Sequence, residues 1–392
     1  LAQVQNVPAA MQTTLVSSLS VSEEYTDNVG LTEDDAESDW TTVISPRLAL
    51  DVLGKTEGLN LSYSPGFTFY AENEENDTIR HSASLSAWKQ LSKHLELNIS
   101  SAFTRTEQPY DPATLALSTA EQELLGLQDF TLRREREPHS TLSGNLGLSY
   151  QFGKRDDLRL GYRYQRTLQE ADDAEDSTRH SPSLTVNYWL TRHFGTVLNA
   201  EYTRGEFSGD TDSFDQWSGS IKFIRNITKF LDGFVQYEHT IMDRQGENED
   251  YQVYDPSAGF SWQFSEDGRL SLDLGYFIQD NEDGDDDSGL VVSGDISKGF
   301  DLDRRTSFRI SGGSGYEQTY FGAENLGFTV YYQGGARLNH GLTRRLSADL
   351  SLDFRRNDYR EQDPDRTDDI WTTQAGLNWV MLQWAVLSLN HT

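Results

Sequence analysis

Residues 142–152 read Leu142-Ser-Gly-Asn-Leu146-Gly-Leu148-Ser-Tyr150-Gln-Phe152, with large apolar side chains confined to one set of alternate positions. Residues 269–278 repeat the pattern as Arg269-Leu270-Ser-Leu272-Asp-Leu274-Gly-Tyr276-Phe-Ile278. Successive side chains of a β-strand point to opposite faces, so each segment predicts a strand with one apolar and one polar face. Segments of about ten such residues, repeated along a chain without a helical domain, are typical of membrane-spanning barrels. We therefore expect the apolar face to contact lipid and the polar face to line a lumen.

The connections between these segments fall into two alternating kinds. Short ones, such as residues 153–157, carry Lys and Arg, whereas long ones, such as residues 206–215 and 355–369, are acidic. Short periplasmic turns and long extracellular loops are a property of outer-membrane barrels. The sequence thus predicts an all-β, antiparallel, up-and-down transmembrane β-barrel of about 18 to 20 strands, with long acidic extracellular loops.

The expected domain organisation is simple. Residues 1–12 form an N-terminal periplasmic segment, and residues 13–392 form a single barrel. The chain begins Leu-Ala-Gln without a charged start and an apolar core, which we interpret as a mature form after signal-peptide cleavage. Roughly nineteen spans would leave the C-terminus outside, whereas single-chain bacterial barrels normally have an even number. Either one segment is not a span or a closing strand is missing at the C-terminus; we favour the second, because residues 384–390 resemble the first arm of a hairpin.

Composition excludes several functional classes. The formal net charge of -30 argues against nucleic-acid binding. The absence of Cys excludes disulfides and thiolate metal sites. Eight His are scattered without metal-ligand spacing, and the chain contains neither a nucleophile elbow nor a phosphate-binding Gly loop. We expect no enzymatic activity and no tightly bound cofactor.

The polar face supplies the candidate pore lining. Charged residues at its alternate positions carry both signs, which predicts a wet wall without strong charge selectivity. Most of them are expected only to solvate the lumen or to pair across strands. The candidates are Arg47, Asp51, Glu96, Arg159, Arg163, Glu201, Lys222, Glu238, Asp273, Arg309, Arg337, Asp349 and Asp353.

The longest connection, residues 109–138, contains a helix signal. Ser118 and Glu121 have the spacing of a capping box, so we expect a short extracellular helix over residues 118–127. The basic residues that follow are Arg133, Arg134 and Arg136. One interpretation is an ordered loop packed over the rim. The other is a constriction loop folded into the lumen, with these cations near its mouth.

Two acidic clusters raise the question of Ca²⁺. Asp280, Asp283, Asp285 and Asp287 offer oxygen ligands for weak calcium binding, but the run does not match the twelve-residue calcium loop. A second role for divalent ions is to bridge the acidic loops to lipopolysaccharide phosphates. The plainer interpretation is a solvated, mutually repelling surface. Outer-membrane lipid and lipopolysaccharide are the expected surroundings in every case.

Three N-terminal stretches resemble a known family. They are Ser22-Glu-Glu-Tyr-Thr-Asp-Asn-Val-Gly-Leu31, Ile44-Ser-Pro-Arg-Leu48 and Leu61-Ser-Tyr-Ser-Pro-Gly-Phe-Thr-Phe-Tyr70. They are similar to the outer-membrane β-barrels associated with exosortase (PEP-CTERM) and exopolysaccharide gene clusters. The resemblance implies export of a polysaccharide in partnership with a periplasmic polysaccharide-export protein. The acidic loops favour a neutral polymer over an acidic one.

Two functional hypotheses follow. The first is a porin-like channel for an exopolysaccharide or for hydrophilic solutes. The second is a structural or adhesive surface barrel with a closed lumen and cation-binding loops, which bulky inward residues such as Trp88, Trp189, Phe277 and Tyr331 would favour.

Pro46 and Pro65 fall inside predicted strands, so we expect bulges or bends there, with both prolines facing lipid.

Overall fold

The computed structural model describes residues 11–27, 29, 37–107, 138–170, 175–209, 211–246, 250–266, 268–282, 286–300, 305–319, 327–359, 366–382 and 385–391. These residues form nineteen strands and one short 3-10 helix, η1 (Glu74–Asn76). The strands are β1 (Gln12–Thr26), β2 (Asp39–Leu53), β3 (Glu57–Tyr70), β4 (Thr78–Gln90), β5 (Leu95–Thr106), β6 (His139–Gln151), β7 (Asp157–Gln169), β8 (Ser177–Trp189), β9 (Phe194–Phe207), β10 (Phe214–Asn226), β11 (Leu231–Arg244), β12 (Tyr251–Gln263), β13 (Gly268–Asn281), β14 (Asp287–Phe300), β15 (Thr306–Thr319), β16 (Gly327–Gly341), β17 (Leu346–Tyr359), β18 (Arg366–Leu382) and β19 (Ala385–His391).

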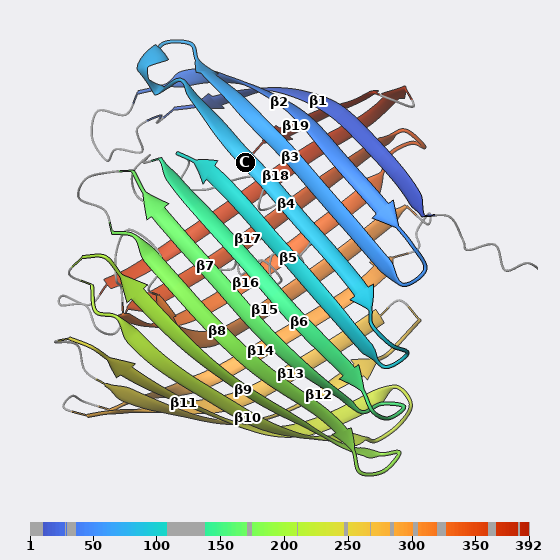
Figure 1. The fold of residues 1–392 in the computed structure, drawn as a ribbon, viewed down its shortest axis with the longest axis vertical. Helices are drawn as coiled ribbons and strands as arrows, with labels where there is room; N and C mark the ends of the chain where they lie inside the picture. The colour runs from blue at the N-terminus through green and yellow to red at the C-terminus, as the bar shows by residue number, and fades with distance from the viewer. Residues whose placement is uncertain are drawn as a thin grey trace, which may run out of the picture.

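Each strand pairs antiparallel with the next one along the chain, from β1–β2 to β18–β19. The resulting sheet curls into a barrel with tilted strands (Figure 1). This confirms the predicted all-β, up-and-down transmembrane barrel. The connections after even-numbered strands lie at one end, the turn rim, and those after odd-numbered strands lie at the other end, the loop rim.

The first and last strands run in the same direction, because each hairpin reverses the chain and eighteen reversals separate them. β1 pairs with β2 and β19 pairs with β18, and no ladder joins β1 to β19 among the residues that the structure describes. The expectation of a further closing strand stays a prediction.

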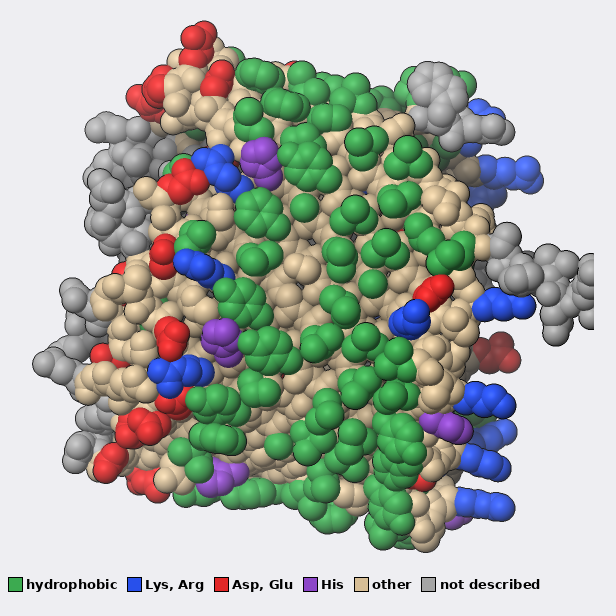
Figure 2. Space-filling model, in the orientation of Figure 1, with side chains coloured by type: hydrophobic (Ala, Val, Ile, Leu, Met, Phe, Trp, Pro, Cys, Tyr) green, Lys and Arg blue, Asp and Glu red, His purple; other side chains and the backbone are tan. Residues whose placement is uncertain are grey.

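The two faces of the sheet differ as the alternation predicts. On β6, Leu142 and Leu146 are 40% and 47% exposed on the outer face, while Ser143 between them is buried on the inner face. Apolar side chains cover the middle of the barrel wall in a broad band, and acidic residues gather at the loop rim (Figure 2). Within the described part of the chain, no helix is both long and apolar enough to cross a bilayer.

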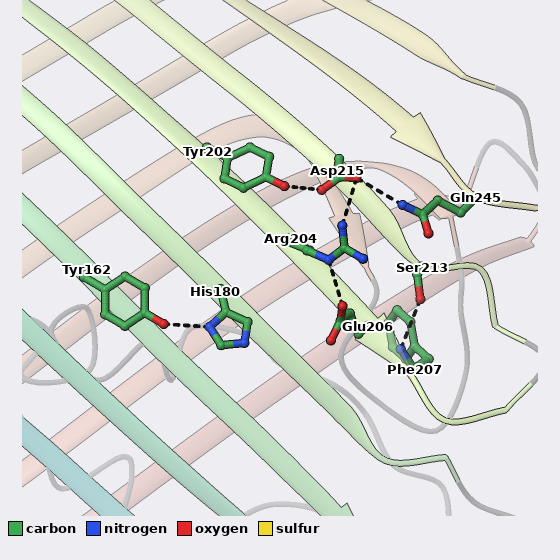
Figure 3. A network of polar contacts seen from close by, with 9 residues as sticks. All are labelled: Tyr162, His180, Tyr202, Arg204, Glu206, Phe207, Ser213, Asp215 and Gln245. Carbon is green, nitrogen blue, oxygen red and sulfur yellow. Dashed lines mark hydrogen bonds and ion pairs between the residues drawn. The ribbon is translucent and has the colours of Figure 1, made fainter.

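Tyrosines mark the loop-rim border of the apolar band. On β3, β9 and β13, an outward-facing Tyr reaches diagonally to a polar side chain on the next strand, two residues closer to the loop rim than its register partner. The pairs are Tyr63 with His81, whose O–N distance is 2.9 Å, Tyr202 with Asp215, and Tyr276 with Ser288. Figure 3 shows the Tyr202 pair within a network that includes Arg204. An apolar ring ending in a hydrogen-bonded hydroxyl suits the lipid–water interface.

Prolines interrupt the ladder without changing the register. β2 and β3 pair on both sides of Pro46 and Pro65, from Ile44–Phe67 to Leu48–Tyr63, and the register is the same before and after the gap. The missing proline N–H groups explain the gap. The alternation places both prolines on the outer face, as predicted. Of the expected bulges or bends, a bulge is wrong, because the register accommodates no extra residue, and a bend stays a prediction.

Candidate functional site: the lumen wall

The structure places all thirteen predicted pore-lining residues on the inner face. Each occupies an alternate position relative to exposed apolar neighbours on the same strand. They lie on β2 (Arg47, Asp51), β5 (Glu96), β7 (Arg159, Arg163), β9 (Glu201), β10 (Lys222), β11 (Glu238), β13 (Asp273), β15 (Arg309), β16 (Arg337) and β17 (Asp349, Asp353). Their role in a pore stays a prediction, whereas their common face follows from the backbone register.

Most of these side chains have polar partners on the same wall. Asp51 accepts a hydrogen bond from Asn60 on β3, and Asp349 accepts one from Asn378 on β18 at 3.0 Å. Arg159 forms an ion pair with Asp157 on its own strand, with Nε 2.9 Å from the carboxylate oxygen. Such cross-strand and same-strand pairs keep charged groups hydrated and spread over the wall. The charged part of the wall therefore carries both signs without a single dominant charge.

A hollow of about 320 Å³ lies along the inner face of β4 to β9. Trp88 and Asn98 line one side, and Arg163 and Glu201 line the other. An indole ring beside amide, guanidinium and carboxylate groups offers both an apolar surface and hydrogen-bond partners of either kind. This combination suits a polar, uncharged solute.

Among the inner-face carboxylates that sequence reasoning missed is Asp255 on β12. It lies opposite Glu238 in the ladder, and its Oδ1 is buried without a hydrogen-bond partner among the described residues. Asp273 on β13 has an Oδ1 in the same condition, and Lys222 lies within electrostatic range of Asp273. The alternation on β12, with Tyr254 and Pro256 outside, is the signal that could have identified Asp255.

Several inward aromatic rings lie flat on the wall instead of projecting across the lumen. A β-carbon added at Gly195 would lie 2.9 Å from the Trp189 ring, and one added at Gly289 would lie 2.6 Å from the Phe277 ring. Trp88 covers Gly58 in the same way. Glycine lacks the β-carbon that would lift the ring, so the aromatic side chain covers the bare backbone of the neighbouring strand. Bulky inward residues therefore need not close the lumen.

A different feature narrows the loop end of the lumen. The β14–β15 ladder ends at Ser293–Gly313, whereas the β15–β16 ladder continues to Thr319–Gly327. Beyond the split, the Tyr316 ring packs in a tilted orientation against the inward-facing Phe277, with ring centroids 5.2 Å apart. Tyr316 and Val330 would face lipid if the wall continued straight, yet both pack on the inner cluster. The loop-rim ends of β15 and β16, described up to Thr319 and from Gly327, therefore lean over the inner face of β13 at Tyr316 and Val330; below, these strand ends are called the tip of the hairpin.

The inner cluster beneath this tip is the main buried apolar core among the described residues. Its members come from five strands, which the hairpin tip covers from the lumen side. They are Phe214, Met242, Tyr251, Val253, Phe277 and Val330. Layers of sheet separated by side chains lie about 10 Å apart, so this packing occupies lumen space. The narrowing here comes from a hairpin of the wall itself.

The predicted constriction residues Ser118, Glu121, Arg133, Arg134 and Arg136 lie outside the described residues, as do Asp283 and Asp285 of the acidic run. Asp280 and Asp287 are described and lie on opposite faces of the β13–β14 hairpin, since Asp287 pairs with the inward Gln279. The described residues contain no group of three or more His, Asp or Glu arranged to hold a metal ion.

Two carboxylates stabilise the loop rim: one is buried among backbone N–H groups, and the other is bound by an arginine of β5. Asp39, only 2% exposed, accepts hydrogen bonds from the N–H groups of Trp40, Ala71, Glu72 and Asn73 at 2.7 to 3.1 Å. Burial opposes ionisation of Asp39, but these donors outweigh it and lower the pKa of its carboxyl.

A second carboxylate bridges three strands. Arg105 on β5 reaches over β6 to Glu170, which follows β7, with N–O distances of 2.8 and 2.9 Å. The hydrogen bonds from the Arg105 guanidinium lower the pKa of Glu170. Both carboxylates order the loop end of the wall, where a solute would enter or leave.

No protein-family model matches the chain. No curated protein matches it either. Solved structures are similar to it in fold. The ferric-catecholate import receptor Fiu from E. coli K12 matches with a TM-score of 0.52 at 12% identity, covering 97% of this chain and 76% of the receptor.

The FrpB iron transporter from Neisseria meningitidis (F3-3 variant) matches with a TM-score of 0.56 at 11% identity, covering 94% of this chain and 67% of the transporter. The ferric yersiniabactin uptake receptor FyuA from Yersinia pestis matches with a TM-score of 0.52 at 11% identity, covering 99% of this chain and 70% of the receptor. At these identities the similarity shows a shared fold, the transmembrane β-barrel.

Proposed function

We propose that this protein is an outer-membrane transport barrel that passes hydrophilic solutes or a polar polymer through its lumen. The observation that carries the proposal is the inner wall, which carries charged and amide side chains on strands from β2 to β17 and on which inward aromatic rings such as Trp88 and Trp189 lie over glycines. The similar structures are named as an import receptor, a transporter and an uptake receptor, which agrees with transport and not catalysis.

Within this function, a neutral polysaccharide is the cargo that we propose. A ring face bordered by amide and charged groups, as at Trp88, Asn98 and Arg163, matches a sugar, which has apolar C–H surfaces and a rim of hydroxyls. The acidic loop rim would repel an acidic polymer at low ionic strength. The resemblance of residues 22–31, 44–48 and 61–70 to barrels of exopolysaccharide clusters, which implies a periplasmic export partner, supports the same cargo.

Planar-bilayer recording tests the transport function. Purified barrel is expected to give stable single-channel currents that neutral oligosaccharides reduce in a concentration-dependent way. Trp88→Ala is expected to weaken this block, and Leu85→Ala on the lipid side of the same strand is the matched control. Absence of any conductance from correctly folded barrel would contradict transport.

A closed, structural or adhesive barrel is the second candidate, and one observation favours it. The tip of the β15–β16 hairpin covers the inner cluster, with Val330 3% exposed, and thereby narrows the loop end. In this case the acidic loops would bind Ca²⁺ or lipopolysaccharide. Deletion of the gene would then reduce surface attachment of the cells and leave polysaccharide secretion intact. Loss of secretion with normal attachment would favour transport.

A further inference from the structure

Five short turns begin, directly after their strand, with one three-residue order: an apolar residue, then Gly, Ser or Thr, then Lys or Arg. They follow β4, β6, β8, β10 and β16 and read Leu91-Ser92-Lys93, Phe152-Gly153-Lys154, Leu190-Thr191-Arg192, Ile227-Thr228-Lys229 and Leu342-Thr343-Arg344. Leu53-Gly54-Lys55 has the same order, but Leu53 is the last residue of β2 and the alternation places it on the inner face, so this turn is not grouped with the five. The turn after β12 has the same first two positions but an acid at the third, in Phe264-Ser265-Glu266. We refer to Lys93, Lys154, Arg192, Lys229 and Arg344 as the turn-rim cations.

The first residue of each turn continues the lipid-facing side of its strand. Strand alternation places it on the outer face, two positions beyond an outward residue such as Lys89 before Leu91 or Tyr188 before Leu190. These apolar side chains are exposed, from 46% at Leu342 to 61% at Leu190. The apolar band therefore extends to the turns themselves, and each cation lies just beyond its edge.

The middle residue closes the turn and leaves the cation at its apex. The hydroxyl of Thr191 accepts a hydrogen bond from the N–H of His193 at 3.2 Å, and that of Thr343 accepts one from the N–H of Arg345 at 3.1 Å. Ser92 and Thr228 make the equivalent bond two residues on. Such local bonds fix the backbone of short turns.

All five turn-rim cations are exposed. Lys and Arg side chains project in a row past the edge of the apolar band at the turn rim (Figure 2). The loop rim shows the opposite balance, since acidic side chains predominate there (Figure 2). The two ends of the barrel therefore present opposite charge to the two membrane surfaces.

We propose that the turn-rim cations bind the phosphate groups of anionic phospholipids in the membrane leaflet at the turn rim. Strands lie about 4.8 Å apart, so cations on alternate hairpins between β4 and β11 are spaced about 10 Å apart around the perimeter. Each lies one residue beyond a small turn residue and two beyond a lipid-facing side chain. Cationic side chains at the edge of an apolar surface extend to the headgroup level.

The perimeter arrangement favours lipid over a protein partner. A folded partner needs a continuous patch of about 800 Å² on each side, whereas four of these cations follow a line about 10 Å apart along the edge of the wall and Arg344 lies on the far side of the barrel. Many small anions, each contacting one or two cations, match a ring of separated charges. The proposal does not depend on what passes through the lumen.

Lipid competition tests this inference on the full chain reconstituted in nanodiscs of phosphatidylcholine with a minor fraction of phosphatidylglycerol. Native mass spectrometry counts the phosphatidylglycerol molecules that each barrel retains. The variant Lys93→Gln, Lys154→Gln, Arg192→Gln, Lys229→Gln, Arg344→Gln is expected to lose this preference, with about a fivefold weaker retention for each removed charge. Glu266→Lys, which completes the motif in the sixth turn, is expected to increase retention.

Substitution of three loop-rim cations, Arg105→Gln, Arg204→Gln and Arg356→Gln, is the control for a turn-rim variant that also loses three charges, Lys93→Gln, Arg192→Gln, Lys229→Gln, and it is expected to leave retention unchanged. If the variant with all five substitutions does not fold, the single variants Lys93→Gln and Lys229→Gln keep the test informative. Equal retention of phosphatidylglycerol by wild type and the turn-rim variants would overturn the proposal. So would selective, turn-rim-dependent binding of an acidic periplasmic protein without any lipid preference.

Discussion

The guanidinium carbon of Arg155 lies 3.2 Å from the centroid of the Trp189 ring. The other face of the same ring lies against Gly195. The turn between β6 and β7 thus clamps an inward indole against the β8–β9 wall. A cation over an indole face is attracted by the ring quadrupole, and the contact is strongest where water is excluded. The relationship explains how a large aromatic side chain can face a lumen without filling it.

Gly195→Ala is expected to break this arrangement. The new β-carbon would lie 2.9 Å from the indole, so the ring must move toward the lumen at a cost of about 1–3 kcal/mol. Urea unfolding of the barrel in lipid vesicles measures the loss, and single-channel recording is expected to show a smaller conductance. Gly147→Ala is the matched control, because its nearest neighbour, the β-carbon of Asn98, is 3.8 Å away. Equal stability of the two variants would contradict the clamp.

Adjacent positions on β5 should respond in opposite ways to a charge. Ile99 faces outward and is 40% exposed, whereas the Nδ2 of Asn98 lies 3.0 Å from the Glu96 carboxylate on the inner face. Ile99→Arg is expected to destabilise the folded barrel by about 2–4 kcal/mol, the cost of a cation near the bilayer midplane. Asn98→Arg gains an opposite charge and is expected to be nearly neutral. Reversible folding into vesicles compares the two, and similar costs would show that the faces are assigned wrongly.

Tyr316 holds the narrowed loop end in place. Removing its ring abolishes the packing against Phe277, so Tyr316→Ala is expected to release the hairpin tip and raise the mean single-channel conductance. Tyr332, which pairs with Ser314 and is 43% exposed, provides a control on the same hairpin. Conductance that is unchanged in Tyr316→Ala, or raised equally in Tyr332→Ala, would mean that the tip does not obstruct passage.

The Asp39 carboxylate should make the loop rim sensitive to acid. Its pKa lies below the ordinary value of 3.8, so the stabilisation is fully present above that pH and is lost as the pH falls through the lowered pKa. Asp39→Asn is expected to increase proteolysis of the segment after β3 at neutral pH and to abolish its further increase in acid. Limited proteolysis between pH 7 and about pH 2 measures both effects. Glu72→Gln, one charge removed from the same loop, is expected to behave as wild type.

The alternation of Leu142 to Phe152 and its repeats was sufficient to predict the fold, because a period of two fixes the face of every side chain once the strands are identified. The same rule placed Arg47, Lys222 and Asp353 on the inner face. Proline positions were predicted correctly in face, but a bulge was wrong, since Pro46 and Pro65 leave a gap in hydrogen bonding without one.

Other features depend on relationships that no single segment carries. To predict that rings lie flat at Gly195 and Gly289, one must know the register between two neighbouring strands. To predict the inward lean of the β15–β16 tip, one must know where the β14–β15 ladder ends. Asp255 escaped sequence reasoning because it stands beside a proline, where strand assignment is weakest. Tertiary pairing decides the flat rings and the inward lean, which is why local pattern could not predict them, whereas the alternation on β12 was sufficient to place Asp255 on the inner face.

Contact between the apolar face and lipid is tested most directly by a spin-label scan of β6. The natural chain contains no Cys, so single cysteines at positions 142 to 150 can be labelled without background. We expect high oxygen accessibility at 142, 146, 148 and 150, and high accessibility to a water-soluble nickel reagent at the inner-face positions 145, 147 and 149. Equal access of the nickel reagent to both sets of positions would contradict a membrane-spanning barrel with a polar lumen.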